Sequence, residues 1–228
     1  MSDKDTILIF EAHSDDCVIS MGGTAILLQK KYDIILVTMT KGETAYTKVE
    51  DKGKMTEIRK KESLAADRIM GIKEHIFLTN PCQDLQNNLE NYHDIIKIIR
   101  KYRPKRIYTH KSPSKHRDHR NTHDVVVEGW WKAFENVLAD YGKPYRAPEL
   151  YFFEVTDLFE FPGEIVDITD VFDKKMEALE AFESQFGVMG AMDDYVRGMA
   201  LVRGYIGGFK YGEAFVKSNF MPTPTKLD

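Results

Sequence analysis

Several features that would assign the chain to a particular class of protein are scarce among its 228 residues. The only cysteines are Cys17 and Cys82, too few for a disulfide framework, and this favours a reducing, cytoplasmic setting. No apolar run approaches the roughly 20 residues that span a bilayer, and the first residues lack the pattern of a secretory signal. A net charge of -4 provides no basic excess to attract nucleic acid. We therefore expect neither a membrane nor a nucleic acid as a partner.

The composition and the order of predicted elements favour a single α/β domain over residues 1–228. Hydrophobic residues make up 43% of the chain, enough to bury a sizeable core. Apolar runs predict strands at 6–10, 34–39, 75–78, 106–109, 150–155 and 164–168. Helical patterns occur at 20–31, 55–70, 88–102, 122–138, 171–186 and 193–206. The alternation in the first part predicts a Rossmann-like, mostly parallel sheet flanked by helices, which the later strands and helices extend.

Ionisable residues gather in two clusters, and each follows a predicted strand directly. The first cluster covers residues 11–16 and the second covers residues 110–119. In an open, doubly wound sheet, ligands bind beyond the carboxyl ends of the strands, where the strand order reverses. In the usual order this point lies between the first and fourth strands. We therefore expect the two clusters to face each other across one crevice.

The residue types in these clusters suit a catalytic metal site. Imidazole nitrogens and carboxylate oxygens are ligands for zinc, and a catalytic zinc usually has three protein ligands and a water molecule. The first cluster offers one histidine and two adjacent aspartates, and the end of the second offers two histidines around an aspartate. Three ligands would leave a carboxylate and a histidine to act as base and as partner for developing charge.

The same residues resemble the motifs of a known family. Residues 13–16, His-Ser-Asp-Asp, resemble the His-Pro-Asp-Asp motif of the PIG-L-like (LmbE-like) zinc N-deacetylases, and residues 116–119, His-Arg-Asp-His, resemble the family's His-Pro-Asp-His motif. The resemblance runs over nearly the whole chain. It also includes Gly22-Gly23-Thr24, Arg59 with Glu62, Asp84, 165–170, Ser184-Gln185-Phe186 and Tyr211-Gly212-Glu213. Among family members, the chain is most similar to diacetylchitobiose deacetylases and to bacillithiol-pathway deacetylases of N-acetylglucosaminyl malate.

This resemblance implies a metal centre and a base. His13, Asp16 and His119 match the family's Zn²⁺ ligands, and Asp15 matches its general base. The implied reaction is hydrolysis of the acetamide of a small N-acetylated amino sugar. The chain would then release acetate and a free amine.

Four further residues receive roles from the resemblance. His116 matches the histidine that stabilises the oxyanion or protonates the leaving amine, and Asp118 matches the carboxylate that orients it. Arg59 matches an arginine that contacts the sugar, and Asp84 is a candidate for substrate binding. Relatives often form hexamers, so the resemblance also implies a homo-oligomer.

Two departures from the family pattern concern the active loops. Ser14 and Arg117 stand where the family usually has proline, and Cys17 stands where many members have glutamate. Because proline fixes φ, both loops are expected to be more mobile here. The substitutions retain all the implied ligands and the base.

Simpler interpretations exist for each motif in isolation. Asp15 and Asp16 could cap a helix, Arg59 and Glu62 could pair on a solvated helix face, and Asp84 could stabilise a turn. Two functional alternatives also remain open: an amidase that removes a larger acyl group, and a metal-binding module without catalysis. The chain lacks the G-x-G-x-x-G fingerprint of dinucleotide binding, and Gly22-Gly23 instead predicts close packing of the first helix.

Overall fold

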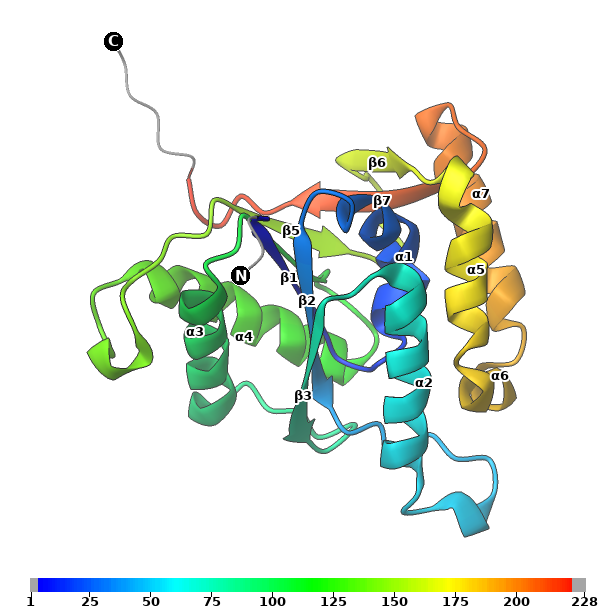
Figure 1. Ribbon diagram of the computed structural model, residues 1–228, viewed down its shortest axis with the longest axis horizontal. Coiled ribbons are helices and arrows are strands. Elements are labelled where there is room, and N and C mark those ends of the chain that lie inside the picture. The colour runs from blue at the N-terminus through cyan, green and yellow to red at the C-terminus, as the bar shows by residue number, and fades with distance from the viewer. Residues whose placement is uncertain (1–3, 223–228) are drawn as a thin grey trace.

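The computed structural model describes residues 4–222, and within them seven strands form one mixed sheet with the order β3-β2-β1-β4-β5-β7-β6 (Figure 1). The first five strands of this order are parallel, whereas β7 runs antiparallel to both β5 and β6. The strands are β1 Thr6–Glu11, β2 Asp33–Thr40, β3 Glu74–Asn80, β4 Arg106–His110, β5 Glu149–Phe153, β6 Glu164–Asp167 and β7 Gly212–Lys217. The predicted α/β class is confirmed.

Helices cover both faces of the sheet (Figure 1). The α-helices are α1 Asp16–Leu28, α2 Met55–Met70, α3 Leu89–Tyr102, α4 Arg117–Phe134, α5 Phe172–Glu180, α6 Glu183–Met189 and α7 Met192–Gly207. Short 3₁₀ helices occur at Val49–Asp51, Ala139–Tyr141 and Thr169–Val171. Helices α3 and α4 pack on one face, and α1, α2, α5 and α7 pack on the other.

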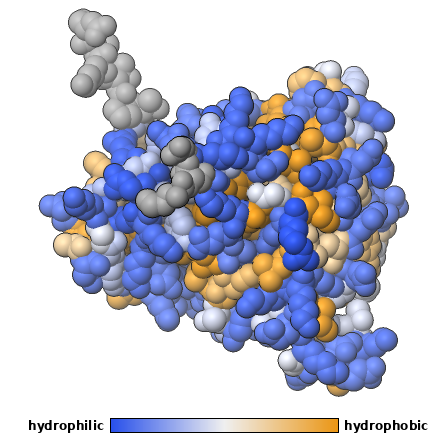
Figure 2. All heavy atoms as spheres, in the orientation of Figure 1, coloured by the Kyte–Doolittle hydropathy of each residue, from blue (hydrophilic) through white to orange (hydrophobic). Residues whose placement is uncertain are grey.

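The strands are buried on both sides, which explains their continuous apolar runs. In β1, Ile7 and Ile9 point into the core beneath α1 and α5, while Leu8 and Phe10 point into the core beneath α3 and α4. Strands of this kind are typical of parallel sheets covered by helices. The outer surface is different: the face shown in Figure 2 is mostly hydrophilic, with apolar residues visible in its middle. Within residues 4–222, no helix is both long enough and apolar enough to cross a membrane.

Three helix boundaries and one strand differ from the sequence-based prediction. Helix α1 begins at Asp16 rather than at residue 20, and α4 begins at Arg117 rather than at residue 122. The charged residues in these first turns interrupt the apolar periodicity by which the helices were recognised. The helix predicted for 171–186 is two helices separated near Phe182, and strand β7 was not predicted. The two early starts place Asp16 and His119, at the ends of the two ionisable clusters, in first helical turns.

Helix α1 contains a break that is stabilised from the far end of the chain. Met21 has non-helical backbone angles, with φ −142° and ψ 20°. The carboxylate of Glu213 accepts hydrogen bonds from the backbone N–H groups of Gly23 (2.9 Å) and Thr24 (2.7 Å). Lys175 pairs with the same carboxylate at 2.7 Å. Because a carboxylate stabilises exposed N–H groups at a helix start, Glu213 caps the second segment of α1.

Gly23 also permits the close packing that the sequence predicted. A Cβ atom at this position would lie 2.8 Å from the Cβ of Ile168, which is closer than real side chains approach. Only glycine therefore lets α1 approach the segment that follows β6.

Candidate active site

The two ionisable clusters meet where the strand order reverses. Strand β1 pairs with β2 on one side and with β4 on the other, so the chain leaves β1 and β4 at the same edge of the sheet. The expected crevice lies there and has a volume of about 420 Å³. It is lined by His13, Asp15, Asp16, Ile19, Thr44, Ala45, Arg59, Cys82, Gln83, His116, His119, Val155, Thr156, Gln185, Val188, Met189, Met192 and Tyr195.

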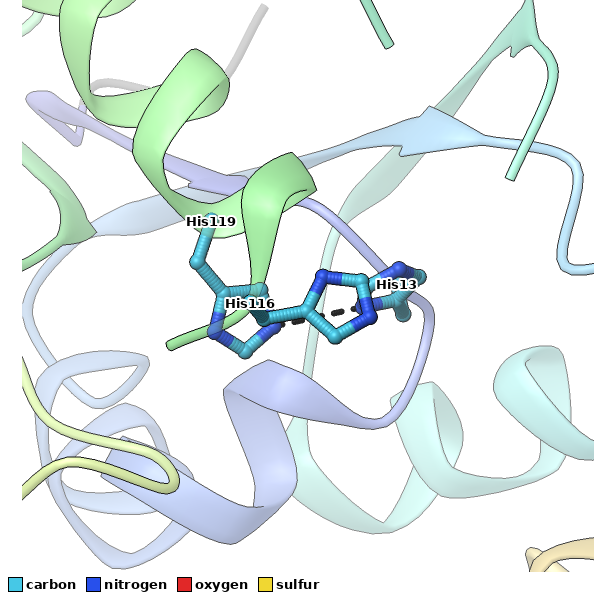
Figure 3. Close-up of side chains that lie close together, drawn as sticks. All are labelled: His13, His116 and His119. Carbon is cyan, nitrogen blue, oxygen red and sulfur yellow. Dashed lines mark hydrogen bonds between the residues drawn. The ribbon is translucent and has the colours of Figure 1, made fainter. Parts of the chain in front are cut away.

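At the floor of the cavity, His13, Asp16 and His119 present their ligand atoms to one another. Nδ1 of His13 lies 3.3 Å from Oδ2 of Asp16 and 3.3 Å from Nε2 of His119. Nε2 of His119 lies 3.3 Å from Oδ1 of Asp16. Figure 3 shows the histidine rings converging, with His13 on the loop after β1 and His119 in the first turn of α4. Three such groups at one point can hold a metal ion.

The electrostatics of this group are those of a ligand set. Burial alone would raise the pKa of the Asp16 carboxyl, but the adjacent His119, His110 and His13 hold it well below its usual range. Burial would lower the pKa of His13, but the negative charge of Asp16 and the hydrogen bond to Asp118 raise it well above its usual value. The lowered pKa keeps Asp16 ionised at neutral pH, and a metal ion that bound here would compete with the proton on His13.

Asp118 lies behind His13 and is fully buried. Its Oδ2 is 3.1 Å from Nε2 of His13 and accepts the backbone N–H of Gln83 (2.6 Å), while Oδ1 accepts that of Leu85 (3.3 Å). Burial opposes ionisation, but these hydrogen bonds lower the pKa of Asp118. Because the carboxylate only accepts, Nε2 of His13 carries the proton, and in the neutral ring the lone pair of Nδ1 faces Asp16 and His119.

The resemblance assigned Asp118 to the orientation of His116, and the contact that the structure gives is different. It is the backbone N–H of Asp118, rather than its carboxylate, that reaches His116, donating to Nδ1 at 3.2 Å. His116 is thus the N-cap of α4, a role in which its ring nitrogen replaces the usual side-chain oxygen. The sequence did not reveal that the carboxylate of Asp118 contacts His13 while its backbone N–H contacts His116, because this depends on where α4 begins.

His116 stands at the side of the metal group, half-buried, with its ring centre 4.6 Å from that of His13 and 4.7 Å from that of His119. Burial and the neighbouring His13 and His119 lower its pKa, so the ring is neutral at pH 7. Since Nδ1 accepts a hydrogen bond, the proton of the neutral ring lies on Nε2. His116 therefore offers one N–H donor.

Arg59 and Asp15 form a buried ion pair that the sequence did not predict. Nη2 of Arg59 lies 2.9 Å from Oδ1 of Asp15, and both residues are 4% exposed. The loop after β2 lies directly on the arginine: a Cβ at Gly42, whose φ is +69°, would be 2.9 Å from Cδ of Arg59. Arg59 lines the cavity as expected for a substrate contact, but the carboxylate that it pairs with is that of Asp15, the expected base.

The remaining candidates are placed as follows. Asp84 is exposed, and its carboxylate accepts the side-chain amide of Gln86 at 2.7 Å. Glu62, predicted as a neighbour of Arg59, binds Ser184 instead, through the backbone N–H (2.8 Å) and the hydroxyl (2.7 Å). This contact ties α6 to α2.

The sequence analysis assigned no catalytic or binding role to two residues at the site, His110 and Cys82. His110 is buried, its pKa lowered to about 3 mainly by burial, and its Nε2 accepts the backbone N–H of Ala12 at 2.9 Å. This contact links the end of β4 to the loop after β1. Cys82 lines the cavity, and its position shortly after a parallel strand was the available signal. Cys17, by contrast, lies in the core.

The chain is similar to known proteins over most of its length. A family model described as GlcNAc-PI de-N-acetylase (PIG-L) matches residues 8–130. The diacetylchitobiose deacetylase of Thermococcus kodakarensis is 28% identical over 235 residues, which cover 96% of this chain and 86% of the relative. The solved N,N'-diacetylchitobiose deacetylase from Pyrococcus horikoshii, complexed with its inhibitor MPG, has 29% identity and a TM-score of 0.87, covering 97% of this chain and 88% of that one.

A third structure shows how widely the fold is used. GalB, the 4-carboxy-2-hydroxymuconate hydratase from Pseudomonas putida, has a TM-score of 0.82, with 98% of this chain and 99% of that one covered. At 22% identity, this likeness shows a shared fold alone. The match to the family model, by contrast, establishes membership of the family, since it covers more than half of the sequence. With residues 8–130 of 228 matched, the chain belongs to the PIG-L family.

Proposed function

We propose that this chain is a zinc-dependent N-deacetylase that hydrolyses the acetamide of a small N-acetylglucosamine-containing substrate. The products would be acetate and a free amino sugar. The observation that carries the proposal is the floor of the cavity, where His13, Asp16 and His119 converge between Asp15 and His116.

The spacing of the three ligand atoms favours zinc. Zn–N and Zn–O bonds of about 2.0–2.1 Å in a tetrahedron separate the ligand atoms by about 3.3–3.4 Å. Nδ1 of His13 and Nε2 of His119 lie 3.3 Å apart, and each lies 3.3 Å from one oxygen of the Asp16 carboxylate, His13 from Oδ2 and His119 from Oδ1. Asp118 completes the arrangement, because a zinc-binding histidine usually donates its other N–H to a carboxylate or carbonyl. When bound, such an ion acidifies a water molecule and polarises a carbonyl oxygen.

Asp15 is the general base in this proposal. Its carboxylate lies beside the ligand Asp16 and lines the same cavity. One oxygen is held by Arg59 at 2.9 Å, which orients the carboxylate and leaves the other oxygen to accept a proton from the attacking water. The same carboxyl group can then return that proton to the leaving amine nitrogen. Arg59 thus acts on the reaction through Asp15 as well as through any contact with the sugar.

His116 is the partner for the developing oxyanion. A neutral ring with its proton on Nε2 donates one hydrogen bond to the carbonyl oxygen as negative charge builds on it. The N-cap contact with Asp118 N–H keeps Nδ1 as the acceptor, so the donor remains on the cavity side of the ring. Removing one such donor typically slows turnover by about 10²–10³-fold.

The walls of the cavity favour a small acetylated sugar. Its volume of about 420 Å³ falls in the range of roughly 300–1,000 Å³ for small-molecule sites. Ile19, Val155 and Met192 provide apolar surface for the acetyl methyl and a sugar face, while Thr44 and Gln185 offer polar groups for hydroxyls. The two relatives named as diacetylchitobiose deacetylases support the same substrate class.

Two alternatives make different demands on the site. An amidase for larger acyl groups would use the same catalytic residues with a longer acyl channel. A metal-binding module without catalysis would have no use for Asp15 and His116 beside the ligands. The pairing of Asp15 with a buried Arg59 favours an enzyme: desolvation offsets much of the attraction in a buried ion pair, so a catalytic role explains the pair better than stability does.

The test is acetate release by zinc-loaded protein. N-acetylglucosamine, diacetylchitobiose and N-acetylglucosaminyl malate are each incubated with the enzyme, and free acetate and free amine are measured. We expect release from at least one, and Asp15→Asn should retain zinc while losing about 10²–10⁴-fold in rate. Asp140→Asn serves as the matched control on an exposed aspartate outside the cavity lining. Zinc-loaded protein that releases acetate from none of the three, yet hydrolyses longer N-acyl glucosamines, would establish the amidase alternative.

A further inference from the structure

A second group of metal-binding side chains lies on the opposite edge of the His13 ring. The ligand atoms of His13, Cys82 and Asp118 all lie within 4.8 Å of one another. Cys82 follows β3, lines the cavity and is 8% exposed, with its Sγ 3.5 Å from Oγ1 of Thr40. A small cation that enters the cavity can therefore reach this sulfur. None of the three catalytic ligands contains sulfur, so the two groups differ in chemistry.

His13 belongs to both groups, through different nitrogens. Its Nδ1 lies 3.3 Å from Asp16 and 3.3 Å from His119, whereas its Nε2 lies 3.1 Å from Asp118. A neutral imidazole has a single nitrogen lone pair, so it ligates one ion at a time. An ion held at Nε2 would withdraw His13 from the catalytic group. It would also occupy the Asp118 carboxylate that orients the ring.

We propose that Nε2 of His13, Sγ of Cys82 and the carboxylate of Asp118 form a second, inhibitory site for soft divalent cations. The cations of this class are Cd²⁺ and Zn²⁺ in excess over one equivalent, because thiolate ligands select soft or borderline metals. The thiol proton of Cys82 passes to solvent and the ring proton moves from Nε2 to Nδ1 as the metal–sulfur and metal–nitrogen bonds form, so Nδ1 no longer offers a lone pair to the catalytic group. The inhibitory consequence rests on the proposed function, in which His13 is a catalytic ligand.

The sulfur supplies a direct readout of this site. Protein loaded with one equivalent of zinc is titrated with CdCl₂ while the ultraviolet charge-transfer absorbance of a cadmium–thiolate bond is recorded. Cadmium that merely replaces zinc at His13, Asp16 and His119 produces no such band, because that group has no thiolate. The wild-type protein is compared with Cys82→Ser, Cys82→Ala and, as a matched control, Cys17→Ser at the other cysteine. Circular dichroism checks that each variant is folded.

We expect a saturable band in the wild type and in Cys17→Ser, and its loss in both Cys82 variants. Absence of the band from the wild type, or its retention in a folded Cys82 variant, would overturn the proposal. A parallel acetate assay should show that excess Cd²⁺ or Zn²⁺ inhibits the wild type, and that Cys82→Ser loses this inhibition when each rate is expressed relative to the same protein's rate with one equivalent of zinc. Inhibition that persists in Cys82→Ser would also count against the site. The band does not depend on any deacetylase activity, so failure of the proposed function would be seen separately.

Discussion

Replacing Asp118 by asparagine tests whether its carboxylate holds His13 in position for the metal. The two oxygens of Asp118 accept three hydrogen bonds, from Nε2 of His13 and the backbone N–H groups of Gln83 and Leu85. Asparagine has one acceptor oxygen. In its better orientation it keeps the bonds to His13 and Gln83, and its NH₂ then faces the N–H of Leu85 at the 3.3 Å separation of the native bond.

The number of hydrogen bonds lost determines the expected change in stability. One buried donor left without an acceptor costs about 1–3 kcal/mol, so the free energy of unfolding of the metal-free protein should fall by about that amount. A neutral amide also holds the His13 N–H less strongly than a carboxylate does. Loss of a group that supports a metal-binding histidine typically weakens metal affinity by about 10–100-fold. We expect Asp118→Asn to show both effects.

The assay is competition for zinc between the protein and a chromophoric chelator, with urea denaturation of the metal-free protein in parallel. Asp84→Asn is the matched control, because Asp84 lies near Gln83 in the same loop but is exposed. It should bind zinc as the wild type does. If folded Asp118→Asn binds zinc with wild-type affinity, the carboxylate does not support His13 and the reasoning is wrong.

Two further predictions concern the scaffold. Gly23→Ala should lower the free energy of unfolding by about 1–3 kcal/mol through overpacking. Gly198→Ala in α7, whose Cβ would meet nothing within 4 Å among the described residues, should raise the free energy of unfolding by up to about 1 kcal/mol. Urea denaturation measures both changes, and equal effects would contradict the packing argument. Burial raises the pKa of Tyr108 to about 12, above the value of about 10 for an unfolded chain, so its stabilising contribution is complete below pH 10 and is lost as the pH rises toward 12. Tyr108→Phe should therefore reduce the loss of stability between pH 10 and 12, whereas Tyr205→Phe, at an exposed position, should not. Identical profiles of stability against pH for the wild type and Tyr108→Phe would refute the raised pKa of Tyr108.

The sequence predicted the position of the site better than its internal contacts. Apolar runs located β1 and β4, and the general behaviour of doubly wound sheets placed the residues after them together. This inference needs only the order of strands. The convergence of His13 and His119 follows from it directly.

Contacts between side chains needed the tertiary structure. The pairing of Arg59 with Asp15 depends on how α2 lies against the loop after β1, and the link from Glu62 to Ser184 depends on how α6 packs on α2. Arg59 and Glu62 are three residues apart on one helix, and this spacing predicts that they interact with each other. In the structure, each side chain instead binds a residue from another element.

The start of α4 shows how a boundary of a few residues decides chemistry. Placed five residues later, as the apolar pattern indicated, the helix would leave the second cluster in a loop. Beginning at Arg117, it presents the free N–H of Asp118 to His116. The polar first turn that obscured the helix is the same feature that builds the site.

Asp118 consequently sets the proton positions of two histidines by two different means. Its carboxylate accepts from Nε2 of His13 and so directs Nδ1 to the metal group, while its backbone N–H donates to Nδ1 of His116 and so leaves Nε2–H free for the substrate. A substitution of the side chain removes the hydrogen bond to His13 and also the negative charge that raises the pKa of His116, but it keeps the backbone N–H. Asp118→Asn should therefore weaken zinc binding and, measured at saturating zinc, shift the part of the pH–rate profile that reports His116 to lower pH. An unchanged profile would mean that the charge of the carboxylate does not act on His116.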